Sequence, residues 1–398
     1  MSEEKRLIRT IKLQNLLSFG PKTEEIELKS LNVLIGPNAS GKSNLIDAIG
    51  LLRATPKDLL LAVRAGGGIM DWLWKGGVQT PTAEIDATIY DPNGMMPLRH
   101  KISFTQVGQR FDLIDETIEN ERPSYGHENE EPIFFYKYQN GRPVLSVSPI
   151  NEKRKLRRED LEINQSVLAQ RKDPDQYPEI TYLVNQYSKI KLYREWNVGR
   201  DTPPRSPQKT DLAEDFLEEN AQNLGLVLND LEHQRGVRNI ILEKLKQFHE
   251  QFDDISTKIH LGNVQIFLHE NGLQQPIPAT RLSDGTLRYL CLLSILCHPS
   301  PPPLICIEEP ELGLHPDILP TIADLLKEAS SKTQLIVTTH SDVLVDALTD
   351  VPDSVLICEK REGSTTMRRL DGHELDKWLE KYSLGELWLK GELGGTRW

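Results

Sequence analysis

One short stretch of the chain has the residue types and the spacing of a phosphate-binding loop. It reads G-x-x-x-x-G-K-S, and the nucleotide-binding residues that it predicts are Gly36, Pro37, Asn38, Ala39, Ser40, Gly41, Lys42, Ser43 and Asn44. Glycines at both ends allow successive backbone N–H groups to turn toward one point, where the N-terminus of the following helix adds partial positive charge. Lys42 can then reach the β- and γ-phosphates, and the Ser43 hydroxyl can bind Mg²⁺. The motif therefore predicts a site for a nucleoside triphosphate with Mg²⁺.

A pair of glutamates offers the acidic chemistry that such a site needs. Glu308 and Glu309 directly follow an apolar run. A carboxylate at the end of a buried strand can hold the Mg²⁺ shell, so we assign the metal role to Glu308. Glu309 would then face the γ-phosphate and polarise the attacking water. Taken alone, the pair is more typical of an exposed acidic turn.

Two further segments could complete the site. Ser283, Asp284 and Gly285 stand at the start of a helical pattern, where Ser283 can cap the helix and leave N–H groups free for an anion. His340 follows another apolar run, and the carboxyl end of a parallel strand is where such sheets bind ligands. His340 could donate to the γ-phosphate. Alone, each is more typical of an ordinary helix cap and of a structural histidine.

The elements that must position these residues follow from hydrophobic periodicity. Strands are predicted at residues 7–15, 24–28 and 31–35, and a helix over 43–52 follows the loop. Toward the C-terminus, helices and short apolar strands alternate; the helices are predicted at 287–297, 318–328 and 343–348, and the strands at 304–307, 334–338 and 355–358. Short apolar strands joined by helices predict a parallel sheet that is covered on both faces.

The middle of the chain is predicted to contain other units. A period of two between residues 83 and 147, with turn signals at Asn93–Gly94 and Asn140–Gly141, indicates an antiparallel sheet. Residues 174–252 have mostly helical patterns, including a helix over 211–221, and strands at 257–260 and 264–268 are predicted to pair across Gly262–Asn263. We therefore expect an N-terminal lobe with the phosphate loop (1–150), a mainly helical insertion (151–254) and a C-terminal lobe (255–398).

Composition narrows the class of protein. The chain has 398 residues, 38% of them hydrophobic and 27% charged, which is typical of a globular protein and not of a disordered or fibrous one. No apolar run approaches the ~18 residues of a membrane span. The N-terminus has no secretory pattern, and the four cysteines form no C-x-x-C pair. We expect a reduced, cytoplasmic protein without a membrane partner.

The charge distribution bears on nucleic acid. The formal net charge is −12, so contact with DNA or RNA requires a local basic patch. The one candidate patch consists of Lys153, Arg154, Lys155, Arg157 and Arg158. Two acids follow it directly, and a run of charges is more often a solvated face.

Together, the motifs resemble those of ATP-binding-cassette (ABC) ATPases, specifically the RecF/SMC/OLD-like branch with its AAA_21-type stand-alone ATPases. The segments that carry the resemblance are N-L-L-S-F (15–19), I-G-P-N-A-S-G-K-S-N (35–44), R-L-S-D-G-T (281–286), I-E-E-P-E-L-G-L-H-P (307–316) and T-T-H-S-D (338–342). They cover both ends of the chain, while the middle is matched only by position. The resemblance implies an α/β fold, namely an ABC-type ATPase head with a P-loop sheet core, an antiparallel β subdomain and a helical insertion lobe.

The resemblance also implies how the motifs work. ATP and Mg²⁺ would be the cofactors, and the chain would form a head-to-tail homodimer or higher oligomer. Residues 283–285 of one subunit would close on the ATP held by Lys42 of the other. Glu309 would activate water, His340 would sense the γ-phosphate, and residues 310–315 would cross the interface. Two departures stand out: Glu308 replaces the aspartate of many relatives, and the glutamine loop has only Gln79 and Gln170 as weak candidates.

Two functions remain open at this point. The first is an ATP-hydrolysing conformational switch that works with a separately encoded effector of the nuclease or Toprim type, in phage defence or DNA repair. The second is an ATP-bound assembly scaffold that holds a partner protein and turns over slowly or not at all. A transporter subunit is less consistent with the long separation between Ser43 and Ser283.

Overall fold

A six-stranded sheet forms the centre of the computed structural model, which describes residues 6–92, 94, 96–123, 131–139, 142–147, 152–155, 161, 162, 164–234 and 236–395. Its strand order is β10 (Lys191–Tyr193), β15 (Leu304–Glu308), β16 (Gln334–Thr338), β3 (Leu31–Ile35), β17 (Val355–Arg361) and β18 (Ser364–Arg369). The first five strands run parallel, and β18 is antiparallel to β17. The predicted parallel sheet is confirmed, and β10 is an addition from a region predicted as helical.

The two faces of this sheet belong to two hydrophobic cores. Cys306 and Ile336 point into one core, whereas Ile305 and Val337 point into the other. Successive side chains of a strand point to opposite faces, so a strand that is covered on both sides needs a continuous apolar sequence. This is why the central strands show no polar alternation.

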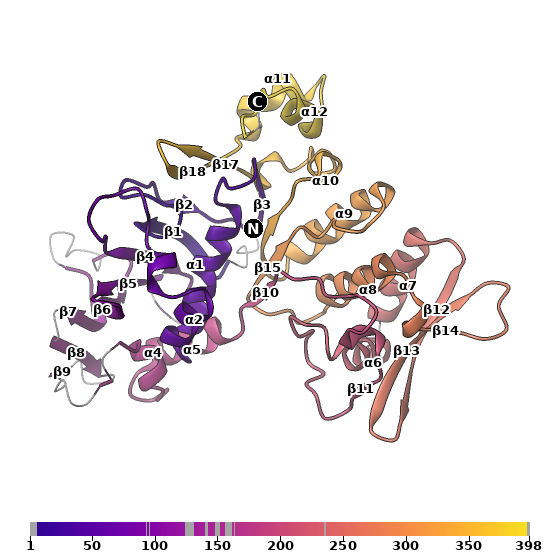
Figure 1. The fold of residues 1–398 in the computed structure, drawn as a ribbon, viewed down its shortest axis with the longest axis horizontal. Coiled ribbons are helices and arrows are strands. Elements are labelled where there is room, and N and C mark those ends of the chain that lie inside the picture. Colours follow the sequence, from indigo (N-terminus) through magenta and orange to yellow (C-terminus); the bar gives the residue numbers. More distant parts are fainter. Residues whose placement is uncertain are drawn as a thin grey trace.

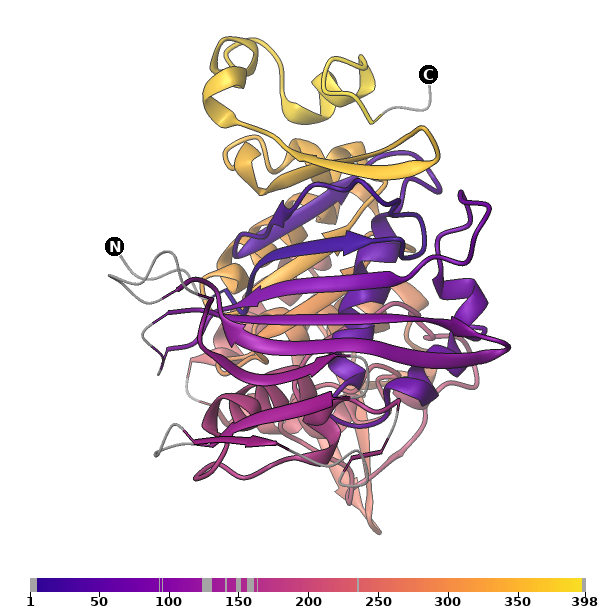
Figure 2. The same cartoon turned by 90° about the vertical axis from the view of Figure 1, so that its left-hand side faces the viewer.

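The first core lies between the central sheet and a second, eight-stranded antiparallel sheet, which Figure 2 shows face on. The strand order is β2 (Ile26–Glu27), β1 (Ile8–Gln14), β4 (Ala83–Ile89), β5 (Leu98–Val107), β6 (Arg110–Asn120), β7 (Phe134–Gln139), β8 (Arg142–Val147) and β9 (Glu152–Lys155). The helices on this side are α1 (Lys42–Ala54), α2 (Leu59–Ala65), α3 (Ile69–Trp72), α4 (Val167–Gln170) and α5 (Pro178–Ser188). The predicted antiparallel sheet is confirmed; of its turn signals, Asn93, Asn140 and Gly141 lie outside the described residues.

The second core holds the remaining helices and a small third sheet, at the right and top of Figure 1. The helices are α6 (Leu224–His233), α7 (Val237–Phe248), α8 (Asp284–Leu296), α9 (Leu319–Ser330), α10 (Asp342–Asp346), α11 (Gly372–Leu379) and α12 (Leu384–Leu389). The sheet consists of β11 (Gln208–Lys209), β12 (Phe252–His260), β13 (Asn263–Glu270) and β14 (Ile277–Pro278). The predicted hairpin is present, but its turn is Leu261–Gly262, because His260 pairs with Asn263.

The helix predicted over residues 211–221 is wrong. This segment forms turns, although its Phe216 and Leu217 are buried as the apolar pattern requires. The Asn223 amide donates to the carbonyls of Ala213 (2.8 Å) and Phe216 (2.9 Å), and its oxygen accepts from the Glu218 N–H (2.8 Å). An asparagine that bonds nearby backbone groups offers them an alternative to the helix.

The middle third of the chain contributes to both cores. Residues 167–192 pack in the first core, and residues 216–268 pack in the second. The three-part division at residues 150 and 254 stays a prediction. No helix within the described ranges has the length and apolar character to cross a bilayer, and the cytoplasmic location likewise stays a prediction.

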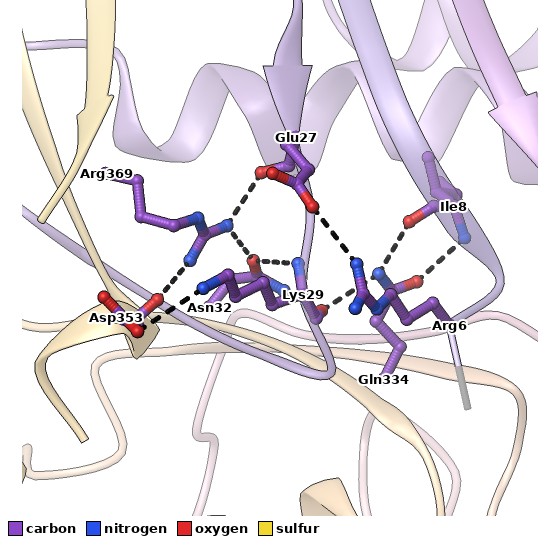
Figure 3. Close-up of polar contacts among 8 residues, drawn as sticks. All are labelled: Arg6, Ile8, Glu27, Lys29, Asn32, Gln334, Asp353 and Arg369. Carbon is purple, nitrogen blue, oxygen red and sulfur yellow. Dashed lines mark hydrogen bonds and ion pairs between the residues drawn. The ribbon is translucent and has the colours of Figure 1, made fainter. Parts of the chain in front are cut away.

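A buried amide joins the two large sheets, as Figure 3 shows. Gln334 begins β16 and is 0% exposed. Its amide nitrogen donates to the carbonyls of Ile8 (2.7 Å) and Lys29 (3.1 Å), and its oxygen accepts from the Ile8 N–H (2.9 Å). Gln334 thereby links the first residue of β16 to β1, at the sheet edge away from the phosphate loop.

Arg369 extends the same network at the end of β18 (Figure 3). Its guanidinium donates to the Glu27 carbonyl and to the side-chain oxygen of Asn32, each at 2.7 Å, and to the Asp353 carbonyl at 2.8 Å. Burial lowers the pKa of Arg369 to about 10. The group stays charged at neutral pH, so it must keep these acceptors.

Replacing Gln334 tests whether this junction stabilises the fold. Gln334→Leu removes the hydrogen-bond partner of the Ile8 N–H and of the Ile8 carbonyl, at about 1–3 kcal/mol for each unsatisfied group, while the Lys29 carbonyl keeps the Asn32 amide. We expect the free energy of unfolding, measured by urea denaturation, to fall by about 3 kcal/mol or more. The exposed Gln79 provides the control, because Gln79→Leu removes an amide that contributes nothing to the core. Equal unfolding midpoints for both variants would contradict this role.

Candidate functional site

The phosphate loop joins β3 to α1, and its two glycines are required by geometry. Gly36 has φ +145°, and a Cβ there would lie 2.2 Å from the Cys358 carbonyl oxygen. Gly41 has φ +104°, and a Cβ there would lie 2.2 Å from the Thr365 hydroxyl. Gly41 is also the N-cap of α1 and supplies no side chain to its N–H groups. The helix start is therefore open to an anion, as the motif predicts.

The lysine of the loop lies directly over it. The Lys42 ammonium donates to the carbonyls of Gly36 (2.8 Å) and Pro37 (3.0 Å). The side chain is thus folded along the concave side of the loop, from which the head group can reach phosphate oxygens. Its predicted role in ATP binding is consistent with this position.

Two hydroxyls that were not among the predicted site residues, those of Thr365 and Ser18, support the phosphate loop on the side of β18. The Thr365 hydroxyl of β18 contacts the Ser40 carbonyl (2.8 Å) and the Ser18 hydroxyl (2.6 Å). Ser18 in turn accepts from the Asn44 amide (2.6 Å). Ser18 belongs to the N-L-L-S-F segment, so the motif was visible in the sequence. Its contact with Thr365 joins residues far apart in the chain, which periodicity cannot reveal.

The C-terminal segment packs against the start of the same loop. The Gly395 N–H donates to the Glu359 carboxylate (2.9 Å), and the Trp388 indole donates to the Gly395 carbonyl (3.2 Å). A Cβ on Gly395 would lie 3.5 Å from the Gly36 Cα. The Gly395 N–H, together with Arg361, lowers the pKa of Glu359. Residues 384–395 thus form a packed end beside the phosphate loop.

The two predicted Mg²⁺ ligands are in contact. The Ser43 hydroxyl donates to the Glu308 carboxylate at 2.8 Å. Adjacent ligands of an octahedral Mg²⁺ with bonds of about 2.05 Å lie about 2.9 Å apart, so this pair of hard oxygens fits the ion. When bound, Mg²⁺ would neutralise charge between the phosphate oxygens. Ser43 and Glu308 would hold the ion there, with Glu308 binding directly or through water.

Arg194 places a positive charge beside Glu308 and Asp47. Its Nε lies 3.4 Å from Glu308 Oε1, and its Nη1 lies 2.5 Å from Asp47 Oδ1. Burial raises the pKa of Glu308, while the Ser43 hydroxyl and Arg194 act in the opposite direction. A bound cation would favour the ionised carboxylate, so metal binding and loss of the proton are linked. Arg194 follows β10, the strand that was not predicted, which is why the sequence did not indicate it.

The two predicted catalytic side chains face each other. His340 Nε2 lies 3.8 Å from Glu309 Oε1, and both residues stand at the carboxyl edge of the central sheet. Glu309 has φ +46°, an unusual conformation for a residue with a side chain. Its N–H donates to the carbonyl of Thr338 (3.0 Å), which holds it in place. Strained residues of this kind cluster at functional sites.

The signature segment lies in the second core, at the start of α8. The Ser283 hydroxyl accepts from the Thr286 N–H (3.0 Å), so the predicted cap is present. Asp284 pairs with Arg205, whose guanidinium also contacts the Leu282 carbonyl. A Cβ on Gly285 would lie 2.8 Å from the Gly313 carbonyl. The segment is therefore held by Arg205 and by its own subunit's 310–315 loop, with Ser283 exposed.

Other predicted residues lie elsewhere. Gln79 is exposed, and Gln170 bonds backbone groups of residues 162–166, so the place of the glutamine loop stays open. In the basic patch, Lys153, Arg154 and Lys155 belong to β9, and Arg157 and Arg158 lie outside the described residues. The four cysteines are free and buried, as small apolar residues; they are Cys291, Cys297, Cys306 and Cys358.

Comparison with known proteins agrees with this geometry. A family model described as AAA domain, putative AbiEii toxin, type IV toxin–antitoxin system, matches residues 31–346. The chain belongs to this AAA_21 family. The match contains the phosphate loop, Ser283, both glutamates and His340. No curated protein sequence matches the chain.

Solved structures extend the comparison to the fold. The chain is similar to the Smc head bound to the C-winged helix domain of ScpA, with a TM-score of 0.55 and 15% identity over 92% of this chain and 99% of that one. It is also similar to the Smc head with an extended coiled coil from Pyrococcus furiosus bound to the C-terminal domain of ScpA (0.55, 14%, 94% and 99%). A third match is the Smc head with coiled coil and joint from Pyrococcus yayanosii (0.53, 12%, 94% and 99%).

The AAA_21 protein is therefore an ABC-type ATPase of the SMC/RecF-like kind, a fold that implies ATP binding. The predicted family and the predicted α/β ATPase-head fold are both confirmed. The individual site residues remain predictions, which the contacts described above support.

A matched pair of glycine variants tests the phosphate loop. Gly41 and Gly236 are both helix N-caps with φ near +100° (+104° and +90°), but a Cβ on Gly236 would meet nothing within 4 Å. Both alanine variants therefore carry backbone strain, of about 1–3 kcal/mol. Only Gly41→Ala also clashes with Thr365 and Ser18. We expect Gly41→Ala to lose binding of a fluorescent ATP analogue by at least about tenfold, or 1.4 kcal/mol, while Gly236→Ala retains it. Equal affinities would show that the loop tolerates the clash.

Proposed function

We propose that this AAA_21 protein hydrolyses ATP with Glu309 as the general base and His340 as the γ-phosphate sensor. The observation that carries the proposal is the meeting of two pairs at one sheet edge: Ser43 with Glu308, and Glu309 with His340. The first pair can hold Mg²⁺ on the β- and γ-phosphates. The second can orient water for in-line attack and stabilise the charge that develops.

We further propose that the active form is a head-to-tail dimer. Ser283 is exposed at the N-terminus of α8, a second helix end suited to an anion. The two residues after it contact Arg205 and the 310–315 loop of their own subunit, and that loop adjoins Glu309. In a symmetric pair, residues 283–285 of each subunit would complete the ATP site of the other. ATP would then join the two subunits.

The proposed biological role is a conformational switch that acts on a separate effector, of the nuclease or Toprim type, in phage defence or DNA repair. The family description names a toxin–antitoxin system, and two similar Smc heads hold a domain of ScpA, which favours a protein partner bound to the ATPase head. The predicted DNA or RNA contact through residues 153–158 is the weaker proposal. An ATP-bound scaffold is the alternative, and it differs in not requiring turnover.

Mixing two inactive variants tests hydrolysis and the composite site together. Lys42→Ala disables the phosphate loop, and Ser283→Arg disables the signature segment. In a head-to-tail dimer, half of the randomly paired molecules are mixed, and each of these has one intact site of two. We expect equal amounts of the two variants to recover about one quarter of the wild-type rate of phosphate release in Mg-ATP.

The controls separate the possible failures. Asp371→Arg removes the N-cap of α11, a helix without buried residues, which is a comparable loss of helix capping, and should leave turnover unchanged. Wild-type phosphate release no greater than that of Lys42→Ala would overturn hydrolysis and leave the scaffold. Active wild type with no recovery on mixing would overturn the shared site.

A further inference from the structure

Glu311 is a half-buried residue to whose carboxylate neither the motif nor the proposed chemistry assigns a role. It stands two residues after Glu309, in the loop expected to cross the dimer interface. One of its oxygens, Oε1, accepts from the Thr339 hydroxyl (2.7 Å) and from the His340 N–H (2.8 Å). Burial raises the pKa of Glu311, and these two hydrogen bonds lower it. The side chain thus reaches from the 310–315 loop to the backbone that carries the histidine.

The loop that contains His340 is also held from other sides, since the Thr339 N–H donates to the Leu34 carbonyl of β3 (3.2 Å). The Thr339 hydroxyl also accepts from the Ser341 N–H (3.0 Å), so the Glu311 carboxylate and the start of α10 share one hydroxyl. On the other side, the Glu309 N–H donates to the Thr338 carbonyl. Glu311 is therefore one of several links that hold His340 near Glu309, and it is the one that starts from the 310–315 loop.

The same loop is also tied to the signature helix. Arg288, in the second turn of α8, donates to the Leu312 carbonyl. Its guanidinium lies 5.3 Å from the Trp196 ring, and the Trp196 indole donates to the Glu308 carbonyl (2.8 Å). The loop that contains Glu311 is thus in contact with α8 through Arg288. Arg288 and Trp196 in turn connect it to Glu308, the first residue of the glutamate pair.

We propose that Glu311 is a positioning residue that fixes His340 to the interface loop. When a second subunit contacts residues 310–315 and shifts this loop, Glu311 transmits the shift to the His340 backbone. The distance between His340 and Glu309 is thereby set. The residue acts through His340 and touches neither ATP nor water. The inference rests on the proposed hydrolytic roles of Glu309 and His340 and on the proposed dimer.

The test compares turnover with nucleotide binding. Glu311→Ala removes the hydrogen bonds that Glu311 accepts from the Thr339 hydroxyl and from the His340 N–H. A misplacement of about 1 Å costs on the order of 10²-fold in rate, so we expect kcat to fall about 10- to 100-fold. The KM for ATP should change by less than about threefold, because the phosphate loop and the Mg²⁺ ligands are untouched. Glu311→Gln keeps an acceptor oxygen and should restore at least about half of the wild-type rate.

A double variant distinguishes positioning from general damage. If Glu311 acts through His340, adding Glu311→Ala to His340→Ala causes no further loss of kcat. Glu116→Ala is the control: its carboxylate likewise accepts from a hydroxyl, that of Ser166, and from a backbone N–H, that of Val167 (2.8 Å), but in the first core, and its loss should leave kcat unchanged. All rates are compared per molecule of folded protein, from the thermal transition of each variant.

The failures of the two proposals can be told apart. A His340→Ala variant with wild-type turnover overturns the proposed role of His340, and this inference with it. A His340→Ala variant that is impaired beside a fully active Glu311→Ala overturns this inference alone. The same holds if the two substitutions prove additive.

Discussion

Parallel pairing of β15, β16 and β3 is the constraint on which the site depends. Val337 of β16 lies opposite Val33 of β3, and Cys306 of β15 lies opposite Ile336 of β16. In this register the three strands end together, because parallel strands present their carboxyl ends at one edge of a sheet. The glutamate pair and the histidine, which follow the phosphate loop by more than 260 residues in sequence, leave that edge beside it. Alternating packing into two cores holds the register, since a slip of one residue would exchange the two faces.

The two cores place different parts of the site on opposite faces of the central sheet, and the middle region of the chain connects them. One core attaches the antiparallel sheet to the face that carries α1, and the other attaches the signature helix α8 to the opposite face. The nucleotide-binding and signature segments are therefore built on different faces of one sheet. The residues that cross between them, Arg194, Trp196 and Arg205, follow β10 in sequence. A short stretch of chain thus contacts both the acidic centre and the start of α8.

Much of this arrangement could be predicted from the sequence, because motifs and strand periodicity are local signals. The phosphate loop, the capping role of Ser283 and the strands that carry Glu308 and His340 all follow from neighbouring residues. What could not be predicted depends on contacts across the fold. The three residues of β10 are too few to show a period, and the turn-forming role of Asn223 depends on its side chain replacing helical hydrogen bonds. Gln334, a polar residue in a buried strand, makes sense only beside the backbone of β1. The support of Gly41 by Thr365 and Ser18 is equally non-local.

On this account, ATP held by Lys42 joins two copies of this chain until water activated by Glu309 hydrolyses the ATP. Sedimentation of Glu309→Gln in Mg-ATP tests this most directly, since that variant keeps the shape of the side chain and removes the base. The account predicts that Glu309→Gln sediments as a dimer with ATP retained, that Lys42→Ala stays monomeric, and that wild type returns to monomer as phosphate appears. A Glu309→Gln protein that binds ATP and remains monomeric at all concentrations would contradict the account.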